Sequence, residues 1–238
     1  MVRHGAEVGG RAPVVLVQYL AALAIVAGIK GYERGWEGVE VRIKWPNDVY
    51  ILDPSSVGPG AAKSRNGNGT ARNDYTTAHN STNGEKRKDE GTYTKLSGIL
   101  VNSSYQSGAY TLVVGIGLNL LNPQPTLSLA QIAAYHNLAP PTQEKLLASI
   151  LTHFEELYTR FCRTGFDKQF EGLYYKAWLH SGQIVVLEDE GGVRVRVRGI
   201  TRDFGLLVCE EVGTGKRWEV MSDSNSFDFF KGLVRRKT

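Results

Sequence analysis

The sequence predicts an α+β protein of two domains, and two observations carry that prediction. Runs of β-branched residues between positions 95 and 118 flank a short Gln-Ser-Gly turn, which is typical of two paired antiparallel strands. After Ser181 the pattern changes to short strands between glycine turns, which indicates a small antiparallel barrel or sandwich. We therefore expect a domain of sheet and packed helices at 1–180 and a small β domain at 181–238.

Apolar residues at helical spacing predict the helices. The segment 13–29 is apolar but contains Gln18 and Tyr19, which favours a buried core helix over a signal sequence or a membrane span. A short helix is expected at 129–135, and Thr142 can cap a longer one. A further helix runs from Gly165 to about His180. The positions of the long helix that we expect to face the core are Leu147, Ile150, Leu151, Phe154, Leu157, Tyr158 and Phe161.

The stretch from about residue 54 to 92 has a different composition from the rest of the chain. It contains "KSRNGNGTARNDYTTAHNSTNGEKRKDEG", which is rich in small, polar and basic residues. Such a stretch cannot bury enough apolar surface to offset its ordering entropy, so we expect a disordered insertion. Its role is either docking and phosphorylation or that of a neutral expanded loop.

Composition excludes several classes of protein. With 238 residues, 42% hydrophobic and 22% charged, the chain is typical of a globular protein without a membrane partner. A net charge of +4 does not identify a nucleic-acid binder. The arginines at 194, 196 and 198 alternate with valines, but no run of aromatic residues accompanies them for base stacking. Cys162 and Cys209 lack metal or disulfide spacing, which favours a reducing, cytoplasmic location.

The segment "VRIKWPNDVY" at 41–50 raises the question of a binding site. Apolar and basic residues alternate as far as Trp45, which predicts a half-buried strand, and Pro46 ends it. Asn47 and Asp48 then lie where a strand meets a loop, a common place for ligands in α/β proteins. Both residues also form ordinary turns, so the local pattern leaves a turn and a binding site open.

Three motifs together resemble those of the biotin protein ligases. They are Lys-Trp-Pro-Asn-Asp at 44–48, "KLSGILVNSS" from Lys95 and "VVGIGLNL" from Val113, followed by a helical pair and a small β domain. The eukaryotic holocarboxylase synthetases are the most similar branch, and the resemblance spans nearly all of the chain outside the insertion. It implies a class II synthetase-like ligase domain with a mixed or antiparallel sheet, followed by an SH3-like β-barrel.

The resemblance implies a two-step reaction. Because the biotin carboxylate is a poor electrophile, ATP must first convert it to biotinyl-5′-AMP, which a lysine of a biotin carrier domain of a carboxylase then attacks. A fixed ammonium offsets the repulsion between the carboxylate and the α-phosphate. The resemblance assigns this role to Lys95, which without the family pattern is a solvated lysine at the start of a strand.

The same resemblance implies the biotin contacts. They are Lys95, Gly98, Ile99 and Leu100. A glycine inside a strand is unfavourable unless something approaches the backbone closely, and a simple bulge is the competing explanation for Gly98.

The nucleotide contacts are also assigned by resemblance. Asn47, Gly115, Gly117 and Asn119 are the expected adenylate contacts, and the Asn119 amide can read both a donor and an acceptor on adenine. Asp48 is expected to hold Mg²⁺ on the phosphates or to orient Lys95, and structurally it can also cap the turn. The implied ligands are therefore ATP, biotin and Mg²⁺.

The first residues depart from the family pattern. The family's Gly-Arg-rich segment, which closes over biotin and the adenylate, belongs upstream of "MVRHGAEVGG", and the glycines of that stretch do not reproduce it. We therefore expect an N-terminally truncated ligase that lacks one or more strands of its sheet. The alternatives are an inactive fragment that binds biotin or a protein partner, and a relative of the lipoate ligases, although the Trp-Pro pair and the β domain argue for biotin.

Overall fold

The computed structural model describes residues 1–57, 91–122, 126–222, 225–228 and 231–236. They form two compact units. The first contains Met1–Ser56, Gly91–Leu179 and Arg202–Phe204, and the second contains Val57, His180–Thr201 and the described residues from Gly205 onward. The assignment of a ligase domain to 1–180 and a β domain to 181–238 stays a prediction.

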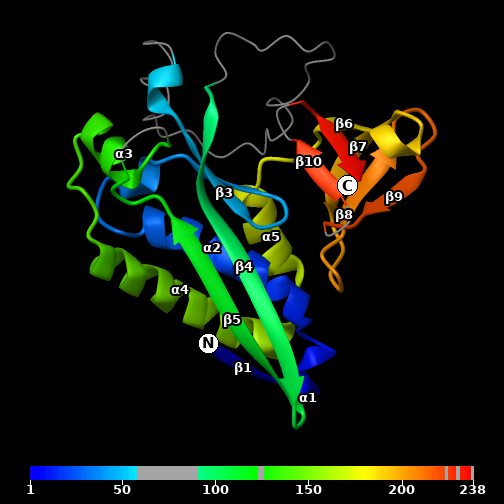
Figure 1. Ribbon diagram of the computed structural model, residues 1–238, viewed down its shortest axis with the longest axis horizontal. Coiled ribbons are helices and arrows are strands. Elements are labelled where there is room, and N and C mark those ends of the chain that lie inside the picture. The colour runs from blue at the N-terminus through cyan, green and yellow to red at the C-terminus, as the bar shows by residue number, and fades with distance from the viewer. Residues whose placement is uncertain (58–90, 123–125, 223–224, 229–230, 237–238) are drawn as a thin grey trace. The chain divides into compact units, whose positions relative to one another are not determined.

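The first unit is built on a five-stranded antiparallel sheet (Figure 1). Its order is β1-β5-β4-β3-β2. The predicted hairpin is present, and its turn places Ser107 and Gly108 at φ values of 51° and 77°, as a tight hairpin turn requires. The strands are β1 (Val2–Gly5), β2 (Val41–Lys44), β3 (Asp48–Leu52), β4 (Tyr93–Gln106) and β5 (Ala109–Leu118).

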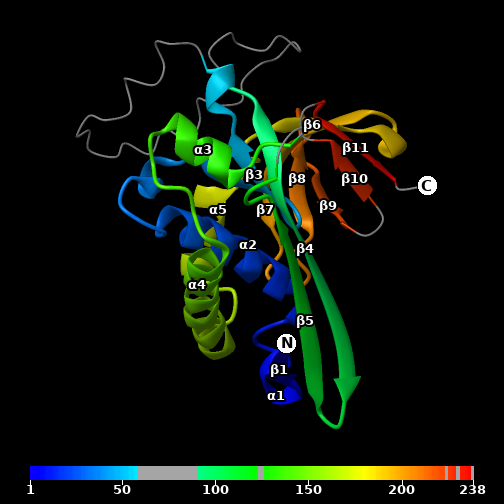
Figure 2. The same ribbon diagram turned by 60° about the vertical axis from the view of Figure 1, so that its left-hand side comes forward.

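The helices of the first unit follow the apolar patterns closely. The predicted core helix is α2, and its side chains are almost all buried. Figure 2 shows α2 and α4 on the same side of the β4–β5 hairpin. Thr142 caps α4 by accepting from the backbone N–H of Lys145 at 3.4 Å, as expected. The helices are α1 (Ala6–Gly9), α2 (Val17–Lys30), α3 (Leu129–Tyr135), α4 (Gln143–Thr164) and α5 (Lys168–Ala177), with 3₁₀ turns at Val14–Leu16, Trp36–Gly38 and Pro54–Ser56.

The apolar stripe of α4 is narrower than its sequence suggests. Leu147 and Leu151 are 51% and 55% exposed, so the expectation that both face the core is wrong. Ile150 and Phe161 are buried, as predicted, and Leu146, which the prediction left out, is buried as well. Ile150 packs so tightly on α2 that a Cβ placed on Gly28 would lie 2.7 Å from its side chain. The contact with α2 therefore selects one edge of the apolar stripe and leaves the other edge exposed.

The predicted strand at 39–45 is shorter in the structure and is followed at once by another. β2 ends at Lys44, a turn with a cis Trp45–Pro46 peptide follows, and β3 begins at Asp48. Trp45 is buried. Asn47 and Asp48 therefore belong to a tight hairpin and not to a loop.

The expected insertion at 54–92 lies mostly outside the described residues. Its two ends are held together, because the Asp53 N–H donates to the carbonyl of Thr92 at 2.8 Å. The Thr92 N–H in turn donates to the hydroxyl of Ser56. These hydrogen bonds join Asp53 and Ser56, on one side of the segment 58–90, to Thr92 on the other.

The second unit is a six-stranded sheet in the order β10-β11-β6-β7-β8-β9. All pairs are antiparallel except β11 with β6. Alternate residues such as Val195 and Val197 fill its core, while Arg198 pairs with Glu210 on the outside. The strands are β6 (Ile184–Leu187), β7 (Val193–Ile200), β8 (Leu207–Glu211), β9 (Arg217–Val220), β10 (Asn225–Asp228) and β11 (Leu233–Arg236), with a 3₁₀ turn at Glu188–Glu190.

The apolar segment at 13–29 forms the 3₁₀ turn Val14–Leu16 and most of α2. Across the ranges that the structure describes, no helix combines the length and the apolar character needed to cross a bilayer.

Candidate functional site

Strand alternation separates two faces of the five-stranded sheet. The core face packs towards α2 and carries the buried side chains of Val41, Ile43, Val49, Ile51 and Ile99. The residues that alternate with these along each strand point to the other side of the sheet, which is called the second face. On this face the pairing register aligns Lys44 with Asp48, Asp48 with Gly98, and Gly98 with Gly117. One row across four strands thus joins two charged residues to two glycines.

A β-bulge brings Lys95 onto this second face. Lys95 and Gly98 are three residues apart, so in a regular strand their side chains would point to opposite faces. The register between β3 and β4 shifts at Val49/Tyr50, so that Tyr50 pairs with Lys95 while Val49 pairs with Ser97. The extra residue, Leu96, is buried. The bulge therefore turns Lys95 to the face that carries Gly98.

Lys95 and Asp48 form a charged pair at the edge of the row. The Lys95 ammonium lies 2.7 Å from Oδ1 of Asp48, and the Lys44 ammonium lies 3.9 Å from Oδ2. The side chains of Lys44 and Asp48 are 16% and 19% exposed, whereas that of Lys95 is 54% exposed. The carboxylate is thus largely withdrawn from solvent between two cations, and only Lys95 extends well into solvent.

Two paired glycines continue the row as a strip without side chains. A Cβ on Gly98 would lie 3.5 Å from Oδ1 of Asp48 and from Nζ of Lys95, and one on Gly117 would meet nothing within 4 Å. Leu100 lies on the same face, opposite Gly115, and is 63% exposed. A ligand can therefore lie directly on the backbone, between an ammonium group and an apolar side chain.

The remaining predicted site residues are held in other ways. Ile99 is buried on the core face, so only its backbone borders the second face. The Asn47 side chain donates to the carbonyl of Ile99 at 2.7 Å, which ties the β2–β3 turn to β4. Asn119 follows β5, where its backbone carbonyl accepts from the N–H of Leu129 at 3.0 Å. Its side-chain Oδ1 lies 3.5 Å from Nδ2 of Asn122.

Sequence reasoning gave no role to Lys44 at this site. The motif itself indicated that Lys44 lies near Asp48, because the two residues flank the turn between the antiparallel strands β2 and β3. Reading residues 41–52 as a hairpin would have paired them across it.

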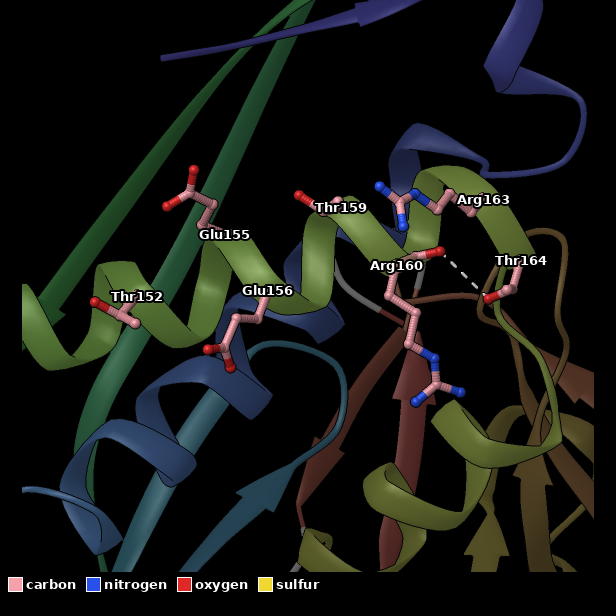
Figure 3. Close-up of a pocket in the computed structure, with 7 residues that line it drawn as sticks. All are labelled: Thr152, Glu155, Glu156, Thr159, Arg160, Arg163 and Thr164. Carbon is pink, nitrogen blue, oxygen red and sulfur yellow. Dashed lines mark hydrogen bonds between the residues drawn. The ribbon is translucent and has the colours of Figure 1, made fainter.

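A surface hollow of about 640 Å³ lies elsewhere, along one side of α4. Figure 3 shows its lining residues along one face of the helix, where their side chains spread apart and do not converge on one point. None of them is a predicted site residue. They are Thr152, Glu155, Glu156, Thr159, Arg160, Arg163 and Thr164.

The second face does not fit a resident magnesium ion. Both oxygens of Asp48 face ammonium groups, an arrangement that suits an anion. In the described part of the chain no three His, Cys, Asp or Glu residues gather in a way that could hold a metal. A magnesium ion here would need the oxygens of a phosphate ligand as well.

Comparison with known proteins agrees with the motifs and the fold. Residues 6–119 match the model of the "Biotin/lipoate A/B protein ligase family". The chain is thus similar to this family over these residues. The biotin–protein ligase of Schizosaccharomyces pombe is 35% identical over 95% of the chain. The chain spans only 33% of that relative's length.

Two solved structures share the fold. The biotin protein ligase of Aquifex aeolicus is 17% identical, with a TM-score of 0.59 over 92% of this chain and 77% of that one. The same bacterium's ligase in complex with biotin and ATP is also 17% identical, with a TM-score of 0.56 over 96% of this chain and 75% of that one. This chain thus shares its fold with that ligase.

Proposed function

We propose that this chain activates biotin with ATP and transfers it to a lysine of a biotin carrier domain. The observation that carries the proposal is the Lys95–Asp48 pair beside the strip formed by Gly98 and Gly117. The likeness to proteins named biotin–protein ligases, and to a structure with biotin and ATP bound, supports these substrates.

In the first step, an oxygen of the biotin carboxylate attacks the α-phosphorus of ATP, pyrophosphate leaves, and biotinyl-5′-AMP forms. The two reactants are both anions, so their approach needs a positive charge between them. Lys95 is suited to this role because its ammonium borders the glycine strip on a long and half-exposed side chain. A fixed ammonium also stabilises the negative charge that develops on the phosphate oxygens.

In the second step, the ε-amine of the acceptor lysine attacks the carbonyl carbon of the adenylate, and AMP leaves. The amine loses a proton during this step. Asp48 is the carboxylate beside the glycine strip, and both of its oxygens face ammonium groups. We therefore assign no general base, and we attribute the contribution of this chain to holding the adenylate in place.

The apolar residues of the second face suit the ring system of biotin. Leu100 and Val113 are 63% and 51% exposed, and the register places them on neighbouring rows beside Gly115. Covering such side chains with an apolar ligand contributes about 25 cal/mol for each Å² removed from water. The charged pair at one end and the apolar residues at the other match a ligand with a carboxylate tail and an apolar ring.

The proposal includes magnesium and a cytoplasmic location. Magnesium would enter with ATP, bound to its phosphate oxygens, and Asp48 is the carboxylate of the predicted site that the motif assigns to it once Lys95 has turned away. Cys162 and Cys209 are both free thiols, which is consistent with a reducing compartment.

The test is biotin transfer by the chain, with biotin, MgATP and an apo carrier domain, followed by the mass of the carrier. Transfer that Lys95→Ala lowers at least about 100-fold supports the proposal. The matched control is Lys145→Ala, since Lys145 is also about half exposed and also pairs with a carboxylate, Glu33. Biotin binding without adenylate formation identifies a binding module instead, and transfer of lipoate in preference to biotin identifies a lipoate ligase.

A further inference from the structure

We infer that Lys44 is a positioning residue that holds Asp48 while Lys95 moves from Asp48 to the anionic substrates. We call this exchange of partners, in which Lys95 leaves Asp48 and Lys44 stays, the handover. It rests on the proposed function and gives a role to the Lys44 ammonium, which the two reaction steps do not otherwise use. Its basis is that Asp48 has two oxygens, each facing a different ammonium group.

The two lysines differ in reach. The side chain of Lys95 is 54% exposed, so its ammonium can turn towards a ligand on the glycine strip. That of Lys44 is 16% exposed, and its distance of 3.9 Å from Oδ2 leaves room to approach the carboxylate more closely. Lys95 is therefore suited to leave Asp48, and Lys44 is suited to remain.

The order of the strands separates Lys44 from the glycine strip formed by Gly98 and Gly117. The row runs from Lys44 on β2 to Asp48 on β3, Gly98 on β4 and Gly117 on β5. Asp48 thus lies between Lys44 and the two glycines. Lys44 acts on Asp48 and does not contact a ligand lying on the strip.

The electrostatic need for a second cation follows from the burial of Asp48. Its side chain is only 19% exposed, and a charged group withdrawn from water is strongly destabilised when its partner leaves. If Lys95 were its sole counter-ion, the departure of Lys95 would leave the carboxylate uncompensated. Asp48 would then retain Lys95 and compete with the substrate anions for it. The Lys44 ammonium removes that competition.

The decisive experiment is a double-mutant cycle between Lys44 and Asp48. Biotin-dependent exchange of pyrophosphate into ATP is measured for Lys44→Met, Lys44→Arg, Asp48→Asn and the Lys44→Met/Asp48→Asn double variant, with the melting temperature of each. We expect Lys44→Met to lower kcat/KM about tenfold and Lys44→Arg to stay within about threefold, because arginine keeps the charge. In the Asp48→Asn background, Lys44→Met is expected to change kcat/KM less than about twofold.

Other outcomes overturn the handover in recognisable ways. Effects that multiply in the double variant mean that Lys44 contacts the substrate itself. A lower melting temperature with unchanged kcat/KM means that Lys44 only stabilises the fold. Lys145→Met, on α4, is the control for the loss of one lysine charge.

A second measurement separates this inference from the ligase proposal. If the wild-type chain gives no exchange, the proposed activity fails, and binding of inorganic pyrophosphate to the same variants is measured by calorimetry. Binding that requires Lys95 and weakens about tenfold in Lys44→Met, but not further in the double variant, supports the handover without the activity. Absence of pyrophosphate binding, or binding that is indifferent to Lys44, overturns it.

Discussion

The two faces of the five-stranded sheet carry different chemistry although the same strands form both. On β4, Ile99 is buried in the core, while its neighbour Leu100 is 63% exposed beside the glycine strip. On β2, Ile43 is buried, while its neighbour Lys44 pairs with Asp48. The difference shows that stability and the proposed chemistry are separated here by single steps along a strand. Substitutions one residue apart should therefore have different consequences.

The largest expected effect is on the core face. Ile99→Ala should lower the free energy of unfolding by about 2–5 kcal/mol, because it removes buried methylene and methyl groups and leaves a cavity. Urea denaturation of the purified chain measures this change. Leu100→Ala is the comparison, and we expect it to cost less than about 1 kcal/mol, since its side chain is already exposed. Equal losses for both variants would mean that the two faces are not distinct.

A smaller effect, on activity, is expected at the glycine strip. Gly98→Ala places a methyl group 3.5 Å from the Asp48 carboxylate and the Lys95 ammonium, where the ligand should lie. We expect biotin-dependent pyrophosphate exchange to fall about tenfold, which corresponds to about 1.4 kcal/mol. The midpoint of urea unfolding should stay nearly constant, because no neighbouring atom is closer than an ordinary contact. Full activity in Gly98→Ala would remove the strip from the site.

The apolar end of the strip should show a weaker effect. Leu100→Ser is expected to raise the KM for biotin about fivefold, close to 1 kcal/mol of lost apolar contact, and to leave the KM for ATP unchanged. Steady-state exchange kinetics give both constants. A change in the KM for ATP, without a change in the KM for biotin, would place the nucleotide and not biotin beside Leu100.

The smallest effect is expected outside both faces. Replacement of residues 60–89 by a short Gly-Ser linker should change the unfolding free energy by less than about 0.5 kcal/mol, because loop-closure entropy varies slowly with length. The hydrogen bond from Asp53 to Thr92 already fixes the two ends. A loss of several kcal/mol, read from the same denaturation curves, would contradict the compositional interpretation of this segment.

The local elements of the fold were predictable. The β4–β5 hairpin, the core helix α2 and the capped helix α4 follow from alternation, apolar runs and turn or cap residues, all of which act within a few positions. The exposure of Leu147 and Leu151 was not predictable, because an apolar stripe on a helix does not indicate which of its two edges a partner helix covers. The contact between Ile150 and Gly28 decides that.

The sequence by itself determined the resemblance to the family, the motifs and the elements that carry them, because these depend on the order of neighbouring residues. Only the tertiary structure decided which side chains meet. The bulge at Leu96 turns Lys95 towards Asp48, and the hairpin register sets Lys44 on the other side of the same carboxylate. Register and bulges are set by pairing and packing between strands that are separate in the chain, so no local pattern fixes them.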